Sequence, residues 1–276
     1  MKIKIKIAFI GCGSMGRAIV ESMLSPVTVA ALKRNGKVFR ITAVDRDEAK
    51  LMPLKGRCDV ALDAAAAVEA SDYVVFAVKP QDFRDCANGL DLARKTVISI
   101  MAGVTLDGLS QVTDAERLVR VMPNLCACVG ESYSVFASRG IVDPDDKQTI
   151  LEILGAFGKF REVDERSIDE ATGISGCGPA YVFKLINAFI VDGVSRGFSP
   201  DVAREMAIQT VIGSALVCEA TGEDTGALVS RVCSPGGATA EGVKVLDERG
   251  FEQTVRAAVE ASVEKAKTLG ADKNDR

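Results

Sequence analysis

Apolar and polar residues alternate at the start of the chain and then give way to an apolar run. Between residues 3 and 7 isoleucines alternate with lysines, and Ala8-Phe9-Ile10 follows without a polar residue. This pattern predicts a strand that enters the middle of a parallel sheet, where both faces are covered. After Gly16, apolar residues recur at helical spacing through Leu24, so a glycine-rich turn is expected to join this strand to a helix.

Strand and helix patterns continue to alternate as far as residue 163. Strands are predicted at 38–44, 73–78, 96–100, 118–122, 133–137 and 159–163, and helices at 64–70, 83–93 and 147–157. Repeated strand–helix–strand units are typical of a doubly wound parallel sheet. We therefore expect an α/β domain over residues 1–164.

From residue 165 the strand pattern disappears and long helical periodicities take over. Helices are predicted at 180–197, 200–221, 224–232, 239–248 and 252–269. Ser199 is expected to cap the second of them, with Pro200 at its first position. The first is apolar on several faces, which a monomer of this size does not readily bury. Residues 165–276 are thus expected to form an all-helical dimerisation domain, with disorder only in the tail from Ala271 to Arg276.

Composition excludes several classes of function. The 276 residues, of which 47% are hydrophobic, can bury a sizeable core in one large domain or two ordinary ones. A formal net charge of −4 with interspersed signs offers no long-range attraction for nucleic acid or an anionic membrane surface. The N-terminal apolar stretch is too short and too rich in lysine for a signal peptide or a membrane span.

The cysteines and the missing histidines narrow the chemistry further. Eight scattered cysteines form neither a disulfide framework nor a zinc motif, a usage typical of a reducing cytoplasm. Because the chain has no histidine, it lacks the usual general base near neutral pH, which excludes Ser-His-Asp and Cys-His hydrolases. Chemistry must come from a cofactor, a carboxylate, a lysine, a thiol or a hydroxyl.

The turn after the first strand carries the G-x-G-x-x-G fingerprint of dinucleotide-binding folds. Its candidate cofactor-binding residues are Gly11, Cys12, Gly13, Ser14, Met15 and Gly16. The first glycine permits the sharp turn, the second lets backbone N–H groups approach a pyrophosphate, and the third lets the helix pack closely on the strand. A purely structural glycine turn is the alternative.

Asp45 and Arg46 follow the second predicted strand, where such folds bind the adenosine ribose. A carboxylate accepts hydrogen bonds from both ribose hydroxyls and favours NAD, whereas an arginine pairs with the 2′-phosphate of NADP. The two residues predict opposite preferences, so the cofactor is NADPH or NADH. A solvated surface turn, Asp45-Arg46-Asp47-Glu48, is the third possibility.

A second glycine-rich element, Val232-Cys-Ser-Pro-Gly-Gly-Ala-Thr239, lies between two predicted helices. Successive N–H groups around Gly236 and Gly237, leading into a helix N-terminus, suit an anion such as a substrate carboxylate. The alternative is an interhelix turn in which Thr239 caps the next helix.

These motifs, with others in the same order, resemble the pyrroline-5-carboxylate reductases, which carry out the last step of proline biosynthesis. The match is most specific over Cys233–Phe251 and spans nearly the whole chain. Its other blocks are Gly11–Gly16, Ala77–Gln81, Ile98–Val104, Val121–Asn124, Asp169–Tyr181 and Thr221–Glu223.

The resemblance implies a Rossmann-like domain, a helical dimerisation domain, and an active site where these domains from different subunits meet. It implies reduction of a cyclic imine by NAD(P)H. The substrate carboxylate would bind Ser234, Gly236, Gly237 and Ala238, and Thr239, the candidate catalytic residue, would hydrogen-bond the ring nitrogen. Glu165 would neighbour the substrate, and the nicotinamide half of the cofactor would lie along Ala77, Val78, Lys79 and Pro80.

The chain departs from the family at Leu125-Cys126, where Thr-Pro is usual, and at Cys177, where serine is common. Two other functions are alternatives. A β-hydroxyacid dehydrogenase would use a lysine and an asparagine in the first long helix, but Lys184 lies about two positions late for that motif. A non-catalytic NAD(P)-binding sensor would not need the loop from Ser234 to Thr239.

Overall fold

The computed structural model describes residues 3–271, so the expectation for the tail at 272–276 lies outside the described residues. The chain divides into two compact units, Met1–Cys177 with Ala261–Arg276, and Gly178–Glu260. We call them the sheet unit and the helical unit. The last strand ends at Glu162, but the units divide further along because Ile168 packs into the core of the sheet unit.

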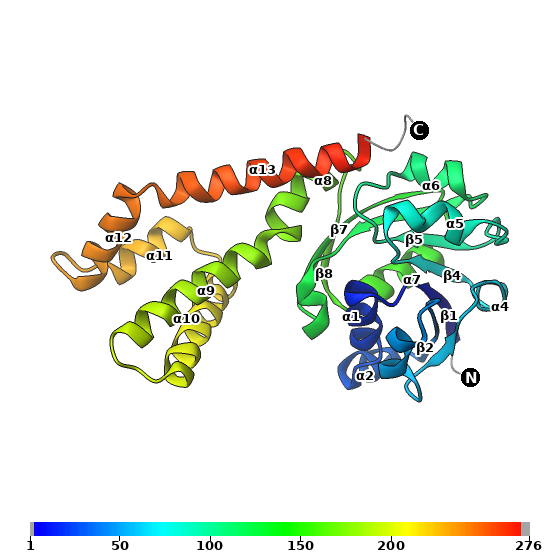
Figure 1. Cartoon of the computed structure of the whole chain (residues 1–276), viewed down its shortest axis with the longest axis horizontal. Helices are drawn as coiled ribbons and strands as arrows, with labels where there is room; N and C mark the ends of the chain where they lie inside the picture. Colours follow the sequence, from blue (N-terminus) through cyan, green and yellow to red (C-terminus); the bar gives the residue numbers. More distant parts are fainter. Residues whose placement is uncertain (1–2, 272–276) are drawn as a thin grey trace. The chain divides into compact units, whose positions relative to one another are not determined.

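The sheet unit contains eight strands in the order β3-β2-β1-β4-β5-β6-β7-β8 (Figure 1). The strands are β1 (Ile3–Ile10), β2 (Lys37–Val44), β3 (Asp59–Ala61), β4 (Tyr73–Phe76), β5 (Thr96–Ser99), β6 (Arg117–Met122), β7 (Ser132–Arg139) and β8 (Gly158–Glu162). The short β3 was not predicted from the sequence. The order reverses between β1 and β4, which places a topological switch point there.

One strand pair departs from the parallel pattern. β7 runs antiparallel to β6, whereas every other neighbouring pair is parallel. The β6–β7 connection contains only the short turn η3 (Leu125–Val129), and a parallel crossover needs a dozen residues or more. The predicted doubly wound sheet is confirmed, with this one reversal.

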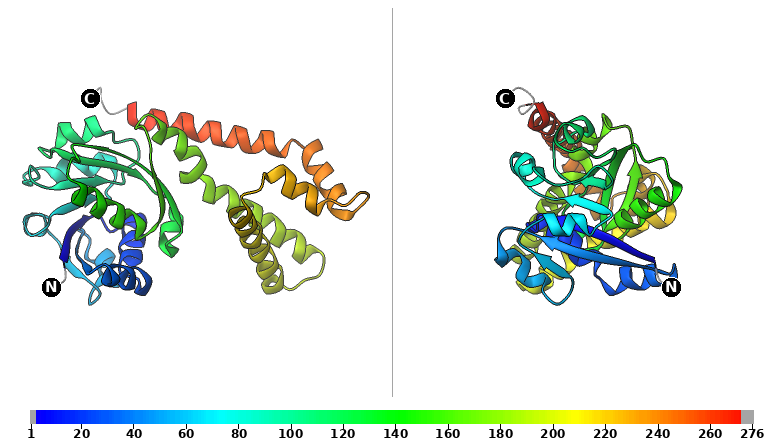
Figure 2. Two further views of the ribbon diagram at one scale, coloured as in Figure 1. Left: turned by 180° about the vertical axis from the view of Figure 1, so that it is seen from behind. Right: turned by 90° about the vertical axis from the view of Figure 1, so that its right-hand side faces the viewer.

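Helices cover both faces of the sheet (Figure 2). One core packs α1 (Ser14–Met23), α2 (Pro26–Arg34) and α7 (Pro144–Gly155) against the odd-numbered residues of β1. The other packs α4 (Ala65–Glu69), α5 (Phe83–Ala87), α6 (Leu106–Val112) and α8 (Ser167–Ala171) against the even-numbered ones. Two further short elements are α3 (Glu48–Leu51) and η1 (Met52–Leu54). The alternating β1 side chains thus separate two cores, as expected for a sheet buried on both faces.

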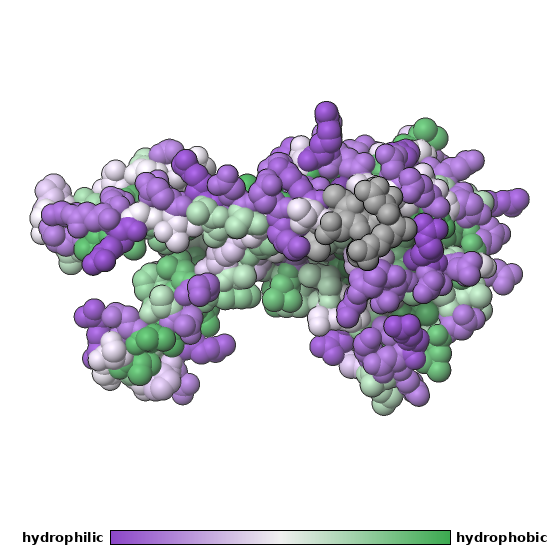
Figure 3. All heavy atoms as spheres, turned by 45° about the horizontal axis from the view of Figure 1, so that its top comes forward, coloured by the Kyte–Doolittle hydropathy of each residue, from purple (hydrophilic) through white to green (hydrophobic). Residues whose placement is uncertain are grey.

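The helical unit is built from α9 (Gly178–Ser195), α10 (Pro200–Thr221), α11 (Thr225–Val232), α12 (Ala238–Glu248) and the start of α13 (Phe251–Ala271). The predicted cap of α10 is confirmed, because the Ser199 side chain accepts a hydrogen bond from the backbone N–H of Val202. No residue of α9 is buried within the chain. Large apolar side chains such as Phe183, Phe189 and Leu216 are about half exposed, and apolar surface of this kind is visible in Figure 3.

A polar cluster ties together the amino ends of β4, β5 and β6. The Tyr73 hydroxyl donates to Oδ1 of Asp146 at 2.6 Å, while Arg117 donates to Oδ2 at 3.1 Å. Burial, together with the hydrogen bond to the Asp146 carboxylate, raises the pKa of the Tyr73 phenol above its ordinary value. The cluster lies at the sheet edge opposite the switch point and stabilises the fold.

Replacing Tyr73 with phenylalanine is expected to lower the free energy of unfolding near pH 8 by about 1–2 kcal/mol, because a buried hydrogen bond to a charged group is lost. A raised pKa in the folded state stabilises the fold fully below the ordinary tyrosine pKa of about 10, and this contribution fades as pH rises above it. The difference between wild type and Tyr73→Phe should therefore narrow in urea titrations between pH values of about 8 and about 10.5. An unchanged difference would contradict this account.

Candidate active site

A groove of about 430 Å³ lies at the carboxyl ends of β1, β2 and β4. It brings together seven of the predicted cofactor residues from three separate segments: Gly11, Gly13, Asp45, Arg46, Ala77, Val78 and Lys79. The groove lies at the switch point, where open α/β sheets bind their ligands. The remaining candidates do not line it: Cys12 and Gly16 are buried, Met15 packs against the core, Ser14 begins α1, and Pro80 begins the turn η2 (Pro80–Asp82).

The three glycines of the fingerprint have different structural roles. Gly11 has a φ of +99°, and a Cβ there would lie 2.7 Å from the backbone of Ala77. A Cβ on Gly16 would overlap the carbonyl oxygen of Gly11, whereas one on Gly13 would meet nothing within 4 Å. Gly11 and Gly16 are therefore required by packing. Gly13 leaves open space in the groove, which fits the close approach of a pyrophosphate.

The carboxylate of Asp45 is buried and already accepts hydrogen bonds from the backbone. Its side chain is almost fully buried, and Oδ2 accepts a hydrogen bond from the backbone N–H of Cys12 at 2.9 Å. Oδ1 accepts from the N–H of Asp47 at 3.0 Å and lies 3.5 Å from Nζ of Lys50. The carboxylate thus holds the glycine-rich turn to the end of β2. The surface-turn interpretation is wrong for this residue, because its carboxylate is engaged by backbone N–H groups.

The thiol of Cys12 lies behind the same turn. Burial, and next the Asp45 carboxylate, raise its pKa to about 12. The thiol therefore stays protonated at neutral pH, and since the thiolate is the reactive form, Cys12 does not act as a nucleophile.

The predicted substrate loop joins α11 to α12 in the helical unit. Gly236 adopts a left-handed backbone with φ of +68°, and the N–H of Gly237 donates to the carbonyl of Ser234 at 2.9 Å. Gly237, not Thr239, occupies the cap position, and no side chain caps α12. The alternative in which Thr239 caps this helix is therefore wrong. The N–H groups of Ala238 and Thr239 belong to the first turn, which has no intrahelical acceptors, so the loop offers donors to an anion.

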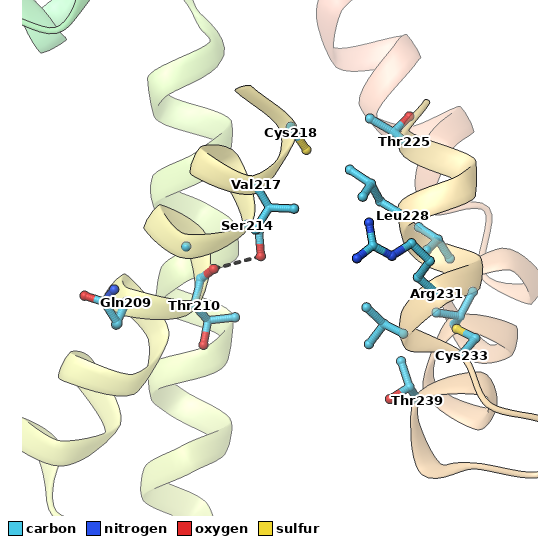
Figure 4. Close-up of a pocket in the computed structure, with 14 residues that line it drawn as sticks. Gln209, Thr210, Ser214, Val217, Cys218, Thr225, Leu228, Arg231, Cys233 and Thr239 are labelled. Carbon is cyan, nitrogen blue, oxygen red and sulfur yellow. Dashed lines mark hydrogen bonds between the residues drawn. The ribbon is translucent and has the colours of Figure 1, made fainter. Parts of the chain in front are cut away.

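Thr239 also lines a groove of about 790 Å³ within the helical unit. Figure 4 shows Thr210, Ser214 and Val217 of α10 on one side, opposite Leu228, Arg231 and Thr239 on the other. Ser234, Gly236, Gly237 and Ala238 do not line this groove. Lys184 and Asn187, which a β-hydroxyacid dehydrogenase would need, are both exposed on α9.

Glu165 lies in the sheet unit, between β8 and α8. Its Oε1 accepts the backbone N–H of Leu106 at 2.6 Å and lies 3.4 Å from Nη1 of Arg120. The other arm of the guanidinium donates to Oδ1 of Asp169 at 2.7 Å. Sequence reasoning missed Arg120, although a charged residue inside the apolar strand Leu118-Val-Arg-Val-Met122 was a visible signal.

Known proteins match this chain along nearly its whole length. A family model described as pyrroline-5-carboxylate reductase dimerisation matches residues 165–269, and one described as NADP oxidoreductase, coenzyme F420-dependent, matches residues 6–103. The pyrroline-5-carboxylate reductase of Escherichia coli K12 is 35% identical over 96% of this chain and 98% of its own length. That of Aquifex aeolicus is 31% identical over 97% and 98%.

The chain belongs to the pyrroline-5-carboxylate reductase family. Solved structures agree. The Plasmodium falciparum enzyme with NADP bound has a TM-score of 0.84 at 30% identity, covering 96% of this chain and 98% of its own. The Coxiella burnetii enzyme has a TM-score of 0.83 at 30% identity, with the same coverage.

Family membership explains the exposed apolar helices. The stretch Ser167–Ser195 has the length and mean hydropathy, 1.4, of a membrane span, and none of its most apolar window is buried within the chain. The dimerisation model covers the same residues. Self-association, as predicted from the sequence, accounts for this surface.

Replacing Phe189 with glutamate is expected to shift the protein towards monomers, because a charge buried unpaired in an apolar interface costs several kcal/mol, roughly 3–5. Light scattering coupled to size-exclusion chromatography measures the change. Val142→Glu is the matched control, since Val142 is a highly exposed apolar residue of the sheet unit. Equal effects of the two substitutions, or none from Phe189→Glu, would count against α9 as the interface.

Proposed function

We propose that this chain reduces pyrroline-5-carboxylate to L-proline with NADPH or NADH as hydride donor. The observation that carries the proposal is the α11–α12 loop, in which a left-handed Gly236 and an uncapped helix start present N–H donors beside Thr239. A dinucleotide groove on the sheet unit of the same chain supports it, as does membership of the family. Such a function lies within amino-acid biosynthesis.

The sheet unit would hold the cofactor. Gly11, Cys12, Gly13, Ser14, Met15 and Gly16 would supply the turn and the helix start for the pyrophosphate. Asp45 and Arg46 would lie at the adenosine ribose, and Ala77, Val78, Lys79 and Pro80 along the nicotinamide half. The bound cofactor supplies a hydride for the carbon of the C=N bond.

The helical unit would hold the substrate. The carboxylate would be bound by Ser234, Gly236, Gly237 and Ala238, and Thr239 would hydrogen-bond the ring nitrogen. Glu165, which belongs to the sheet unit, would neighbour the ring. A cyclic imine can arrive already protonated from solution, so the site needs no strong base, in agreement with the absence of histidine. The residues mainly orient donor and acceptor at near-attack distance. We propose that the α11–α12 loop of one subunit meets the dinucleotide groove of the sheet unit of another subunit.

We place the boundary between the two domains at residues 164 and 165, where the family model for dimerisation begins. The cytoplasm is the proposed location, since all eight cysteines are free thiols, which suits a reducing compartment.

Initial rates with pyrroline-5-carboxylate and each reduced cofactor test the function. We expect proline formation with a stoichiometric loss of reduced nicotinamide absorbance, and the ratio of kcat/KM values gives the cofactor preference. NADPH binding without turnover would instead favour the non-catalytic sensor.

Replacing Thr239 with alanine is expected to lower kcat about a hundredfold, because a hydrogen bond to the reacting nitrogen is lost. The Kd for NADPH, measured by fluorescence titration, should stay within about twofold of wild type. This corresponds to a change in the binding free energy of less than about 0.4 kcal/mol. Thr239→Ser keeps the hydroxyl and should restore much of the rate. Equal losses of turnover and cofactor affinity would argue against a contact with substrate.

Alanine at Gly13 and at Gly16 should have different effects. Gly13→Ala is expected to raise the Kd for NADPH about tenfold or more, equivalent to about 1.4 kcal/mol, with little change in Tm because its Cβ meets no protein atom. Gly16→Ala should lower the free energy of unfolding by about 3 kcal/mol or more, because its Cβ overlaps the Gly11 carbonyl. Calorimetry and cofactor titration together separate the two, and a reversed pattern would contradict the assignment.

A further inference from the structure

Arg120 is a buried cation in the middle of the sheet, and it faces two carboxylates. Its side chain is 4% exposed, while those of Glu165 and Asp169 are about a quarter exposed. Its guanidinium binds the two carboxylates with different nitrogens, Glu165 at 3.4 Å and Asp169 at 2.7 Å. A buried arginine left unpaired is strongly destabilising, so the three groups must remain together in the folded chain.

The two carboxylate oxygens of Glu165 have different environments. Oε1 accepts from Leu106 and faces Arg120, whereas Oε2 has no partner among the described residues. No buried side-chain oxygen or nitrogen in the described part of the chain lacks a hydrogen-bond partner. Oε2 is therefore accessible, and Glu165 presents one anchored oxygen and one open oxygen.

The same carboxylate positions a loop at the carboxyl edge of the sheet. Leu106 begins α6, and residues 100–105 join β5 to that helix. β5 is the neighbour of β4, whose end supplies Ala77 and Lys79 to the cofactor groove. Arg120 thus acts on this edge through Glu165.

We propose that Arg120 is a positioning residue for the reduction, which anchors Oε1 of Glu165 and leaves Oε2 free to contact the substrate. The inference rests on the proposed function and extends it to a residue that touches neither cofactor nor substrate. The planar guanidinium of Arg120 is essential, because a lysine at this position has one point charge and cannot hold both carboxylates in the same arrangement.

Three single variants and one double variant test the inference. Glu165→Gln keeps the size of the side chain and an acceptor for Leu106 but loses the charge. Arg120→Lys keeps the charge but loses the fork. Asp169→Asn is the matched control, since its amide keeps Oδ1 as an acceptor for Nη2 of Arg120 and leaves the contact between Arg120 and Glu165 unchanged.

We expect Glu165→Gln and Arg120→Lys each to lower kcat/KM for pyrroline-5-carboxylate by about 10- to 100-fold, since misplacement of a positioned group has effects of this size. The kcat/KM of the double variant should be no lower than that of the less active single variant, because both changes disrupt the same interaction. Asp169→Asn should stay within about threefold of wild type, and all variants should bind NADPH with a Kd within about twofold.

A solely structural role would give a different result. Asp169→Asn would then lose as much activity as Glu165→Gln. Alternatively, the losses of activity in Glu165→Gln and Arg120→Lys would multiply in the double variant. Either outcome overturns the inference. A wild-type protein without turnover of pyrroline-5-carboxylate would instead overturn the proposed function, and this inference with it.

Discussion

The close backbone packing at the end of β1, where the glycine-rich turn meets the start of α1 and the segment after β4, sets the position of the groove at the switch point. Helix α1 packs so tightly on the turn that a Cβ on Gly16 would overlap the carbonyl of Gly11, while Gly11 itself approaches the backbone of Ala77. The buried Asp45 carboxylate then holds the N–H of Cys12, linking the turn to the end of β2. The groove at the switch point is therefore shaped by close backbone contacts at Gly11 and Gly16 and by the hydrogen bond that the Asp45 carboxylate accepts.

The helical unit is subject to a different constraint. Within residues 178–260 the buried apolar side chains are two alanines, Ala203 and Ala207, whereas large side chains on α9 and α10 stay exposed. Such a unit gains little from burial in a single chain, because the stabilisation scales with the apolar area removed from water. Its stability must come from association, and the stability of an obligate dimer cannot be separated from subunit concentration. Any change that weakens the interface is therefore expected also to weaken the helices that carry the predicted substrate loop.

The sequence allowed most of the fold to be predicted, because the strand and helix periods are strong where both faces of the sheet are covered. Three features were not predicted from local pattern. The reversal of β7 was accessible from the sequence, because the segment between the predicted strands at 118–122 and 133–137 is too short for a parallel crossover. The cap at Gly237 depends on backbone angles, whereas the sequence made Thr239 the obvious candidate. The role of Asp45 depends on where the N–H groups of Cys12 and Asp47 point, which periodicity does not reveal. The glycines of both loops were predicted from their motifs, and the left-handed backbone that favours glycine is present at Gly11 and Gly236 among them.

The missing histidine changes what the rest of the site has to provide. Without an imidazole, whose ordinary pKa lies near neutral pH, the proposed reaction relies mainly on the orientation of hydride donor and acceptor. Orientation requires that each side chain have few alternatives, and Glu165 meets this requirement because Arg120 and Leu106 both hold its Oε1. A buried arginine serves better than a lysine, since it stays charged and its planar fork binds two partners at once. The network around Arg120 is therefore the counterpart of the glycine-rich turn in the proposed function: the turn would position the cofactor, and the network would position the Glu165 carboxylate.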